Sequence, residues 1–277
     1  MRYCLTLSYD GSPFCGYQIQ PGSPSVQETV EAALSRLLGG SVAITGAGRT
    51  DTGVHASHYV AHFDLNGPLP FGQADFCYKL NAILPRQIVV HSVSEVADDF
   101  HARFDATKRE YTYFLHRSKD PFVENYSWRC GYPVLDFDAM NRAALHLLGT
   151  HDFSAFEKTG GDNKTSICTV YEAFWAPYTP SHIQVMGSPL CHTEAPQGIL
   201  CHTEAPQGPS VSPYWYFRIA ANRFLRNMVR ATVGTLIEIG RGKHSPDRIL
   251  SLLESGTRSD AGESVPAHAL FLSHIDY

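Results

Sequence analysis

The residues best suited to chemistry lie in a glycine-rich segment, 46–56, which reads GAGRTDTGVHA. It places Arg49 two residues before the carboxylate of Asp51, among glycines that permit sharp turns and close approach of a ligand. A carboxylate in such a loop can act as a nucleophile, handle a proton or stabilise developing positive charge. The residues alone also fit a simpler interpretation, in which Asp51 makes an Asx-turn beside a solvated Arg49.

Two further pairs of side chains have spacing that could serve a site. Tyr111 and Tyr113 lie two apart in a predicted strand, so they face the same side of it. Arg226 and Arg230 lie four apart in a predicted helix and are expected to share a face. By themselves these patterns favour a solvated helix face for the two arginines and a place in the core for Tyr113, which is the usual role of an aromatic side chain in a strand.

Composition and the same segment exclude several classes of protein. The 277 residues suffice for one large domain or two average ones, and 43% are hydrophobic, which excludes a disordered chain, a collagen or a coiled coil. No apolar run approaches the roughly 18 residues of a membrane span. The segment lacks the Gly-Lys-Ser/Thr end of a P-loop, and no helical pattern follows it as in a dinucleotide-binding loop.

Charge and cysteine usage suggest a compartment but no partner. The net charge is -5, so composition does not indicate nucleic-acid binding, although a local cationic cleft remains compatible with it. The seven cysteines are odd in number and scattered, which favours reduced thiols over a disulfide framework. The N-terminus enters a strand pattern without the apolar stretch of a signal peptide. We therefore expect a cytoplasmic protein without a membrane segment.

Hydrophobic periodicity predicts a mixture of strands and helices that must position these side chains. The predicted strands are 3–9, 42–45, 58–64, 87–93, 108–116, 165–176 and 214–220. The predicted helices run from 26 to the glycines at 39–40, over 74–84, 137–148 and 224–239, and onward from 245. Strands often follow one another without a helix between them, which favours an α+β fold with largely antiparallel sheets.

One nine-residue sequence, LCHTEAPQG, occurs twice, at 190–198 and 200–208. The copies have no helical or strand period and lie in a Pro/Gly-rich stretch, which favours a surface insertion near 187–210. The alternative is a metal site at the Cys-His pairs 191–192 and 201–202, but their spacing matches no common zinc pattern.

Four stretches together resemble the tRNA pseudouridine synthase A family. They are the opening YDGSPFCGYQIQPGSPSVQETVEAAL, the segment GRTDTGVHA, the strand block FHARFDATKREYTYFL and the helix block FLRNMVRATVGTLIEIGRGK. They occur in the family's order and span most of the chain. The departures are Thr52, where the family usually has alanine, and the duplicated insertion, which falls outside these blocks.

The resemblance implies a site and a reaction. It assigns Asp51 as the catalytic aspartate, Tyr111 as a substrate-binding tyrosine, and Arg49 and Arg230 as cationic substrate-binding residues, with Arg230 paired to Asp51. The implied activity is isomerisation of uridine to pseudouridine in the tRNA anticodon stem-loop, at positions 38, 39 and 40. It requires no metal or cofactor, and the implied assembly is a homodimer.

The resemblance also implies a domain organisation, the pseudouridine synthase fold. Two similar α+β halves are expected, 1–105 with the catalytic loop and 106–277 with the tyrosine strand, the arginine helix and the insertion. Each would carry a largely antiparallel sheet flanked by helices, with the cleft between the two sheets. Two alternatives stay open: a non-catalytic tRNA-binding protein on the same scaffold, and a synthase with another RNA target.

Overall fold

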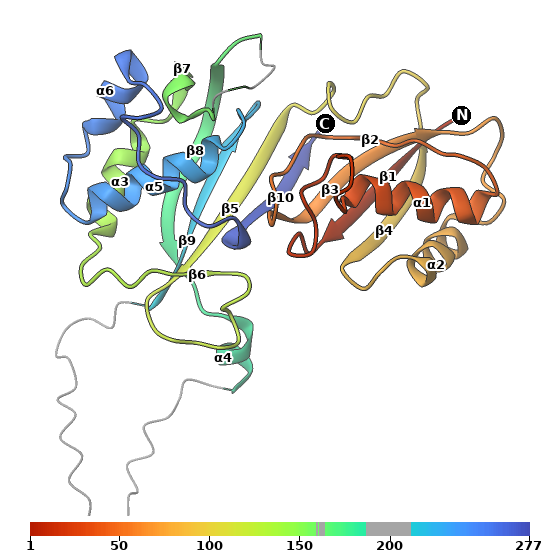
Figure 1. Cartoon of the computed structure of the whole chain (residues 1–277), viewed down its shortest axis with the longest axis horizontal. Coiled ribbons are helices and arrows are strands. Elements are labelled where there is room, and N and C mark those ends of the chain that lie inside the picture. The colour runs from red at the N-terminus through yellow and green to blue at the C-terminus, as the bar shows by residue number, and fades with distance from the viewer. Residues whose placement is uncertain (159, 161–163, 187–211) are drawn as a thin grey trace, which may run out of the picture.

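A computed structural model describes residues 1–158, 160, 164–186 and 212–277 of the chain. In these residues one ten-stranded sheet is accompanied by six α-helices and two 3-10 helices (Figure 1). The strands are β1 (Arg2–Tyr9), β2 (Thr45–Gly46), β3 (His55–Asp64), β4 (Ile88–Val96), β5 (Lys108–His116), β6 (Trp128–Arg129), β7 (Gly149–Asp152), β8 (Ile167–Pro177), β9 (Tyr214–Ala221) and β10 (Leu270–Asp276). The helices are α1 (Val26–Leu38), α2 (Gln73–Ile83), α3 (Phe137–Leu145), α4 (Ser181–Met186), α5 (Met228–Gly240) and α6 (Arg248–Ser255), with η1 (Ser154–Phe156) and η2 (Ala267–Ala269).

The first half of the chain packs α1 and α2 against β1, β3 and β4. Leu5 and Leu7 of β1 are fully buried, as the period-two pattern predicts. Ser25 caps α1 by accepting a hydrogen bond from the Glu28 amide, 3.2 Å away. Gly39 ends the helix in the left-handed region, at φ 74°, where glycine has no steric penalty. Both predicted ends of this helix are therefore confirmed.

The second half packs α3, α5 and α6 against β5, β8 and β9, and α5 is buried along nearly its whole length. The predicted helix over 224–239 begins later, at Met228. Asn227 has φ 66°, the left-handed region, and so cannot continue a right-handed helix upstream. Arg226 therefore lies before the helix, and the prediction that it shares a helical face with Arg230 is wrong.

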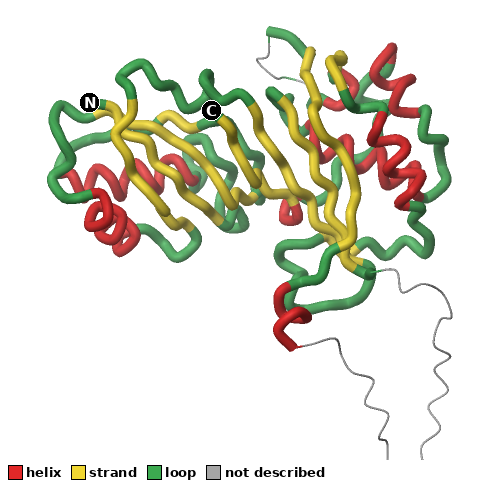
Figure 2. Tube along the Cα trace, turned by 180° about the vertical axis from the view of Figure 1, so that it is seen from behind, coloured by secondary structure: helices red, strands yellow, loops and turns green. Residues whose placement is uncertain are grey.

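A C-terminal strand that the periodicity did not predict joins the two halves. β10 pairs in parallel with β3, through Phe271 opposite His55, and antiparallel with β5 on its other side. The order β4-β1-β3-β10-β5-β9-β8-β7 therefore makes one continuous sheet (Figure 2). The α+β class with largely antiparallel pairing is confirmed, but the halves share this sheet instead of carrying one each.

The strand predicted over 42–45 is mostly an irregular segment. Val42 and Ile44 are buried as the pattern requires. Their amides, however, donate to side chains of α1, Val42 to Ser35 at 3.0 Å and Ile44 to Glu31 at 2.9 Å. Because these side chains satisfy the amides, the segment needs no partner strand until Thr45.

The repeated insertion near 187–210, with both Cys-His pairs, lies outside the described residues, so its prediction stays a prediction. Among the residues described, no helix is long and apolar enough to span a bilayer.

Candidate active site

The segment 46–56 connects β2 to β3 and is held from one side by the loop that follows β1. Thr50 is buried, its hydroxyl lies 2.9 Å from the Tyr9 hydroxyl, and its carbonyl oxygen accepts from the Tyr17 amide at 3.2 Å. At Gly46 a side chain would collide with the rings of Tyr17 and Tyr59, so this glycine serves packing. The loop is thereby ordered on both sides of Asp51.

Asp51 faces Arg230, which reaches it from the first turn of α5. The Nη1 atom of Arg230 lies 3.7 Å from Oδ2 of Asp51, and the Asp51 side chain is 33% exposed. The Nε atom of Arg230 donates to the carbonyl oxygen of Val265 at 2.7 Å, which orients the guanidinium towards the carboxylate. The ion pair that the resemblance implied is thus present.

The simpler interpretation of Asp51 as an Asx-turn residue does not fit this geometry. The turn at 51–54 is closed by main-chain groups, with the Val54 amide donating to the Asp51 carbonyl oxygen at 3.1 Å. In the described part of the chain the Asp51 side chain accepts no hydrogen bond from a backbone amide. Its carboxylate oxygens are therefore open to solvent or to a ligand.

Tyr111 lies at the boundary of the two halves and packs against the hydrophobic clusters of both. Its ring meets the Phe224 ring edge to face, with centroids 5.0 Å apart. The pKa of Tyr111 is raised to about 12, chiefly by burial; Arg109 opposes the shift and the Asp51 carboxylate adds to it. The hydroxyl stays protonated at neutral pH beside the carboxylate. Tyr113 is fully buried, as predicted for a core tyrosine.

Arg49 is exposed and lies on the rim of a depression, whereas Asp51, Tyr111 and Arg230 form the group that the structure brings together. Arg226 is exposed, and its carbonyl oxygen accepts from the Lys158 amide at 3.0 Å.

Sequence reasoning missed Arg109, whose side chain holds the loop in place through hydrogen bonds to the main chain. Its guanidinium donates to four carbonyl oxygens, those of Ala47, Arg103, Ala106 and Asn222, at 2.7–3.3 Å. Burial lowers the pKa of Arg109. Its basic residue type and its place two positions before Tyr111 were the only signals, since the four acceptors are far apart in sequence.

His55, at the end of the loop, is a second anchor. Its Nδ1 accepts from the Gly11 amide at 3.0 Å, and its Nε2 lies 2.9 Å from the carbonyl oxygen of His268. These bonds assign the neutral ring with its proton on Nε2. The ring also stacks on Phe271 of β10, with centroids 4.5 Å apart. These contacts join the loop to the C-terminal segment.

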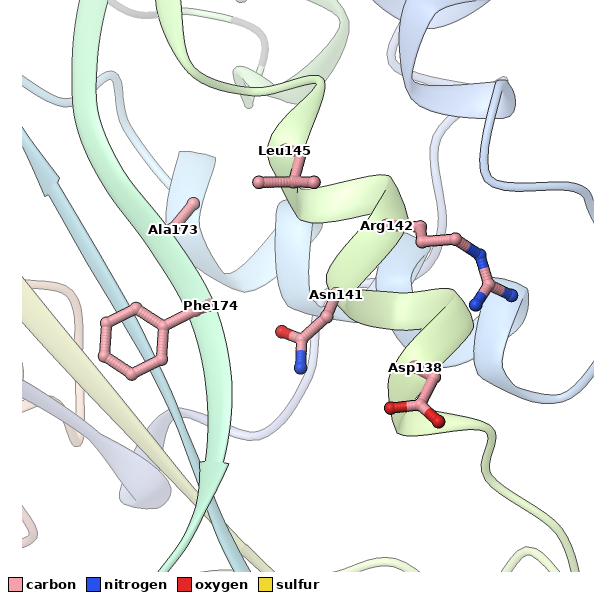
Figure 3. Close-up of a pocket in the computed structure, with 6 residues that line it drawn as sticks. All are labelled: Asp138, Asn141, Arg142, Leu145, Ala173 and Phe174. Carbon is pink, nitrogen blue, oxygen red and sulfur yellow. The ribbon is translucent and has the colours of Figure 1, made fainter.

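A separate groove lies between α3 and β8 (Figure 3). It is lined by Asp138, Asn141, Arg142, Leu145, Ala173 and Phe174. The Asn141 amide bonds both the carbonyl oxygen and the amide of Trp175, at 3.1 and 2.7 Å, so its polar atoms tie the helix to the strand. We therefore interpret the groove as the packing boundary between α3 and β8.

No group of three His, Cys, Asp or Glu side chains arranged to hold a metal ion occurs among the described residues. The loop, the ion pair and the partly buried Tyr111 instead form a site of protein side chains, open on the Asp51 side. Such a site can offer a carboxylate, a cation and a protonated hydroxyl to one bound group.

Comparison with known proteins places this chain in a family. The family model described as tRNA pseudouridine synthase matches residues 6–105 and 143–277. Proteins named tRNA pseudouridine synthase A from Porphyromonas gingivalis and Bacteroides fragilis are each 42% identical, covering 100% of this chain and 97% and 96% of theirs. The protein of that name from Bacillus subtilis is 39% identical, over 100% of this chain and 99% of its own. By these matches the chain belongs to the tRNA pseudouridine synthase family.

Proposed function

We propose that this chain isomerises uridine to pseudouridine at positions 38, 39 and 40 of the tRNA anticodon stem-loop, with Asp51 as its catalytic residue. The observation that carries the proposal is the pairing of Asp51 with Arg230 beside Tyr111. The full-length relatives named tRNA pseudouridine synthase A support the reaction.

The chemistry assigns a role to each side chain. The bond from the ribose to N1 of the base breaks, the base turns, and a new bond forms to C5, whose proton leaves while N1 gains one. Asp51 acts as a nucleophile towards the ring or the ribose, or stabilises the positive charge that develops on the sugar, and it handles the proton. The reaction is redox-neutral and needs no electron acceptor.

The neighbours of Asp51 suit a nucleotide that has left its stack. Extruding a base costs a few kcal/mol, which stacking and hydrogen bonding in the pocket must offset. The ring of Tyr111 supplies a stacking face and its protonated hydroxyl a donor. Arg230 offsets the carboxylate charge, which would otherwise repel the phosphates. Arg49, two residues away and exposed, is positioned to contact the RNA strand.

We also propose that the chain acts in the cytoplasm as a homodimer, with halves 1–105 and 106–277. The two hydrophobic clusters support this division: one comes mainly from residues 3–102 and the other mainly from 113–270. β10 crosses it, since Leu272 and Ile275 pack in the first cluster.

Asp51→Asn tests the assignment directly. The substitution keeps the size of the side chain and removes its charge, and an asparagine could still make an Asx-turn. We expect at least a thousandfold loss of pseudouridine formation, about 4 kcal/mol of transition-state stabilisation, with tRNA affinity and melting temperature nearly unchanged. The measurement is pseudouridine yield in an unmodified tRNA transcript; near-normal turnover would refute Asp51 as the catalytic residue.

Site mapping on the same transcript separates the alternatives. A non-catalytic tRNA-binding protein would give a binding curve and no product. A synthase with another RNA target would leave uridines 38, 39 and 40 unchanged and modify total RNA elsewhere. Modification confined to these three positions is the result we expect.

A further inference from the structure

A depression of about 190 Å³ lies directly beside the proposed catalytic loop, which contributes Gly48 and Arg49 to its lining. Its lining includes Tyr17, Gln18, Gln27, Gly48, Arg49 and Arg103. Arg49 comes from the loop itself and Arg103 from the turn between β4 and β5. We propose that this depression binds a backbone phosphate of the RNA strand, held between Arg49 and Arg103; the inference rests on the proposed tRNA substrate.

The two arginines of the depression carry positive charge that no nearby carboxylate among the described residues neutralises. Arg49 and Arg103 are both exposed, and within the described part of the chain neither forms an ion pair. Glu31, beneath the depression, already accepts from the Gln27 side chain and the Ile44 amide. Asp105, two residues after Arg103, accepts from the His101 amide at 2.7 Å. Two guanidinium groups on a protein of net charge -5 are thus left without a carboxylate.

The two chain segments that carry Arg49 and Arg103 are held together by Arg109. The guanidinium of Arg109 donates at once to the carbonyl oxygens of Ala47, at 3.0 Å, and Arg103, at 2.7 Å. It thereby fastens together the two chain segments that carry the arginines of the depression. Phosphate recognition by arginine gains from such preorganisation, because the planar fork can bind two oxygens at once.

The rest of the lining of the depression is largely polar, which does not suit a purely apolar occupant. Gln27 is saturated, since its amide nitrogen donates to Glu31 and Ile44 and its oxygen accepts from the Ile19 amide. The space beside Gly48 is open, with no atom where a side chain would stand. The charged groups of the lining, the guanidinium groups of Arg49 and Arg103, are donors only, and they match the acceptor oxygens of a phosphate.

Position decides which phosphate is held. Arg49 and Asp51 are two residues apart, so their Cα atoms lie within about 7 Å of each other. A phosphate at the depression therefore belongs to the target uridine or to an adjacent nucleotide. Its capture would anchor the strand while the base turns in the site, which is a binding role and not a chemical one.

Arg103→Ala tests the subsite, because the Arg103 carbonyl and not its side chain serves the Arg109 bonds. We expect the Kd for an unmodified tRNA transcript to rise about tenfold and the slope of log K against log salt to shrink by about 1. The single-turnover rate at saturating tRNA should stay within about twofold. Arg103→Lys should retain the salt slope and recover part of the affinity, since it keeps the charge and loses the fork.

Arg36→Ala is the matched control. Arg36 is exposed near the end of α1, nine residues or about 13 Å along the helix from Gln27, and should leave both Kd and slope unchanged. An equal effect of Arg36→Ala would overturn the subsite in favour of a diffuse field, and so would an unchanged binding curve for Arg103→Ala. If Arg103→Ala lowers the melting temperature, Arg103→Gln measured well below its own transition gives the same comparison.

Binding and turnover separate this inference from the proposed function. An Arg103→Ala protein that binds like the wild type while the wild type makes pseudouridine overturns the subsite alone. A wild-type protein that binds tRNA with the predicted Arg103 dependence and makes no pseudouridine overturns the reaction alone.

Discussion

Two arginines reach the loop that carries Asp51, and they differ in how many of their hydrogen-bond donors are already occupied. Arg109 donates to four main-chain carbonyl oxygens and has no carboxylate partner in the described part of the chain. In the described residues the Arg230 side chain makes one main-chain bond, to Val265, and its Nη1 lies 3.7 Å from Asp51. A guanidinium saturated by backbone holds the chain, whereas one left partly open can meet a ligand.

The same contrast applies to the side chains around them. His55 uses both ring nitrogens on main-chain groups, whereas Asp51 accepts nothing from the backbone in the described residues. Residue type does not separate the roles of Arg109 and Arg230. Position in the sequence does not separate the roles of His55 and Asp51, which both lie in the segment 46–56. Saturation of hydrogen-bonding capacity does, and it predicts which substitutions should harm stability and which should harm catalysis.

The largest effect on stability is expected for Arg109→Met. Methionine fills much of the space but leaves up to four carbonyl oxygens without their donor, each at a cost of about 1 kcal/mol or more. We expect the free energy of unfolding to fall by about 3–4 kcal/mol, measured by chemical denaturation. Arg86→Met, at an exposed position in the turn after α2, is the control. Loss of activity without loss of stability would contradict the assignment of Arg109 as a structural clamp.

Arg230→Met should show the opposite profile. Removing the cation beside Asp51 is expected to lower the single-turnover rate about a hundredfold, or about 2.7 kcal/mol, because the carboxylate loses its orienting partner. The melting temperature should change little, since in the described residues the side chain gives up one hydrogen bond, to Val265, and one partly exposed ion pair. Arg230→Lys should recover part of the rate. If the variant were strongly destabilised but each folded molecule reacted at the normal rate, Arg230 would have a structural role like that of Arg109.

Much of the site was predictable because its residues lie in contiguous blocks. The resemblance assigned Asp51 and Arg230 from two contiguous sequence blocks, and the ion pair that it implied is present. Tyr113 as core and the ends of α1 followed from periodicity and capping, which are also local. The roles of Asp51, Arg49, Tyr111 and Arg230 in the reaction remain predictions.

Most of the features that could not be predicted depend on chain segments that are distant in sequence. The pairing of β10 with β3 joins Phe271 to His55, and no local pattern encodes that register. The four acceptors of Arg109 are likewise scattered, Asn222 being 113 residues away. The late start of α5 has a local cause, the left-handed Asn227, but the apolar pattern runs through it and hides it.

The smallest effect concerns His55 and pH. Burial lowers the pKa of His55, although the His268 carbonyl and Asp10 oppose the shift. The folded state therefore favours the neutral ring more than the unfolded chain does, whose histidine has a pKa near 6.5. His55 thus contributes stability that is fully present above about pH 6.5 and is lost as the pH falls from there through its folded pKa.

His55→Gln isolates this contribution, since glutamine retains one donor and one acceptor but does not titrate. Over the window below pH 6.5 the wild-type free energy of unfolding should fall more steeply than that of the variant, by up to about 1.4 kcal/mol per pH unit, the limit for one proton. Above that window the two slopes should be parallel. Protonation of Nδ1 would also remove the acceptor of the Gly11 amide. The loss of stability at low pH should therefore begin at this loop and not at a remote surface. The measurement is denaturation at several pH values, with His91→Gln as the control, because His91 is exposed and bonds only the Ser8 hydroxyl in the described residues. Equal slopes for the wild type and His55→Gln would show that the neutral His55 ring is not what ties the catalytic loop to the C-terminal segment.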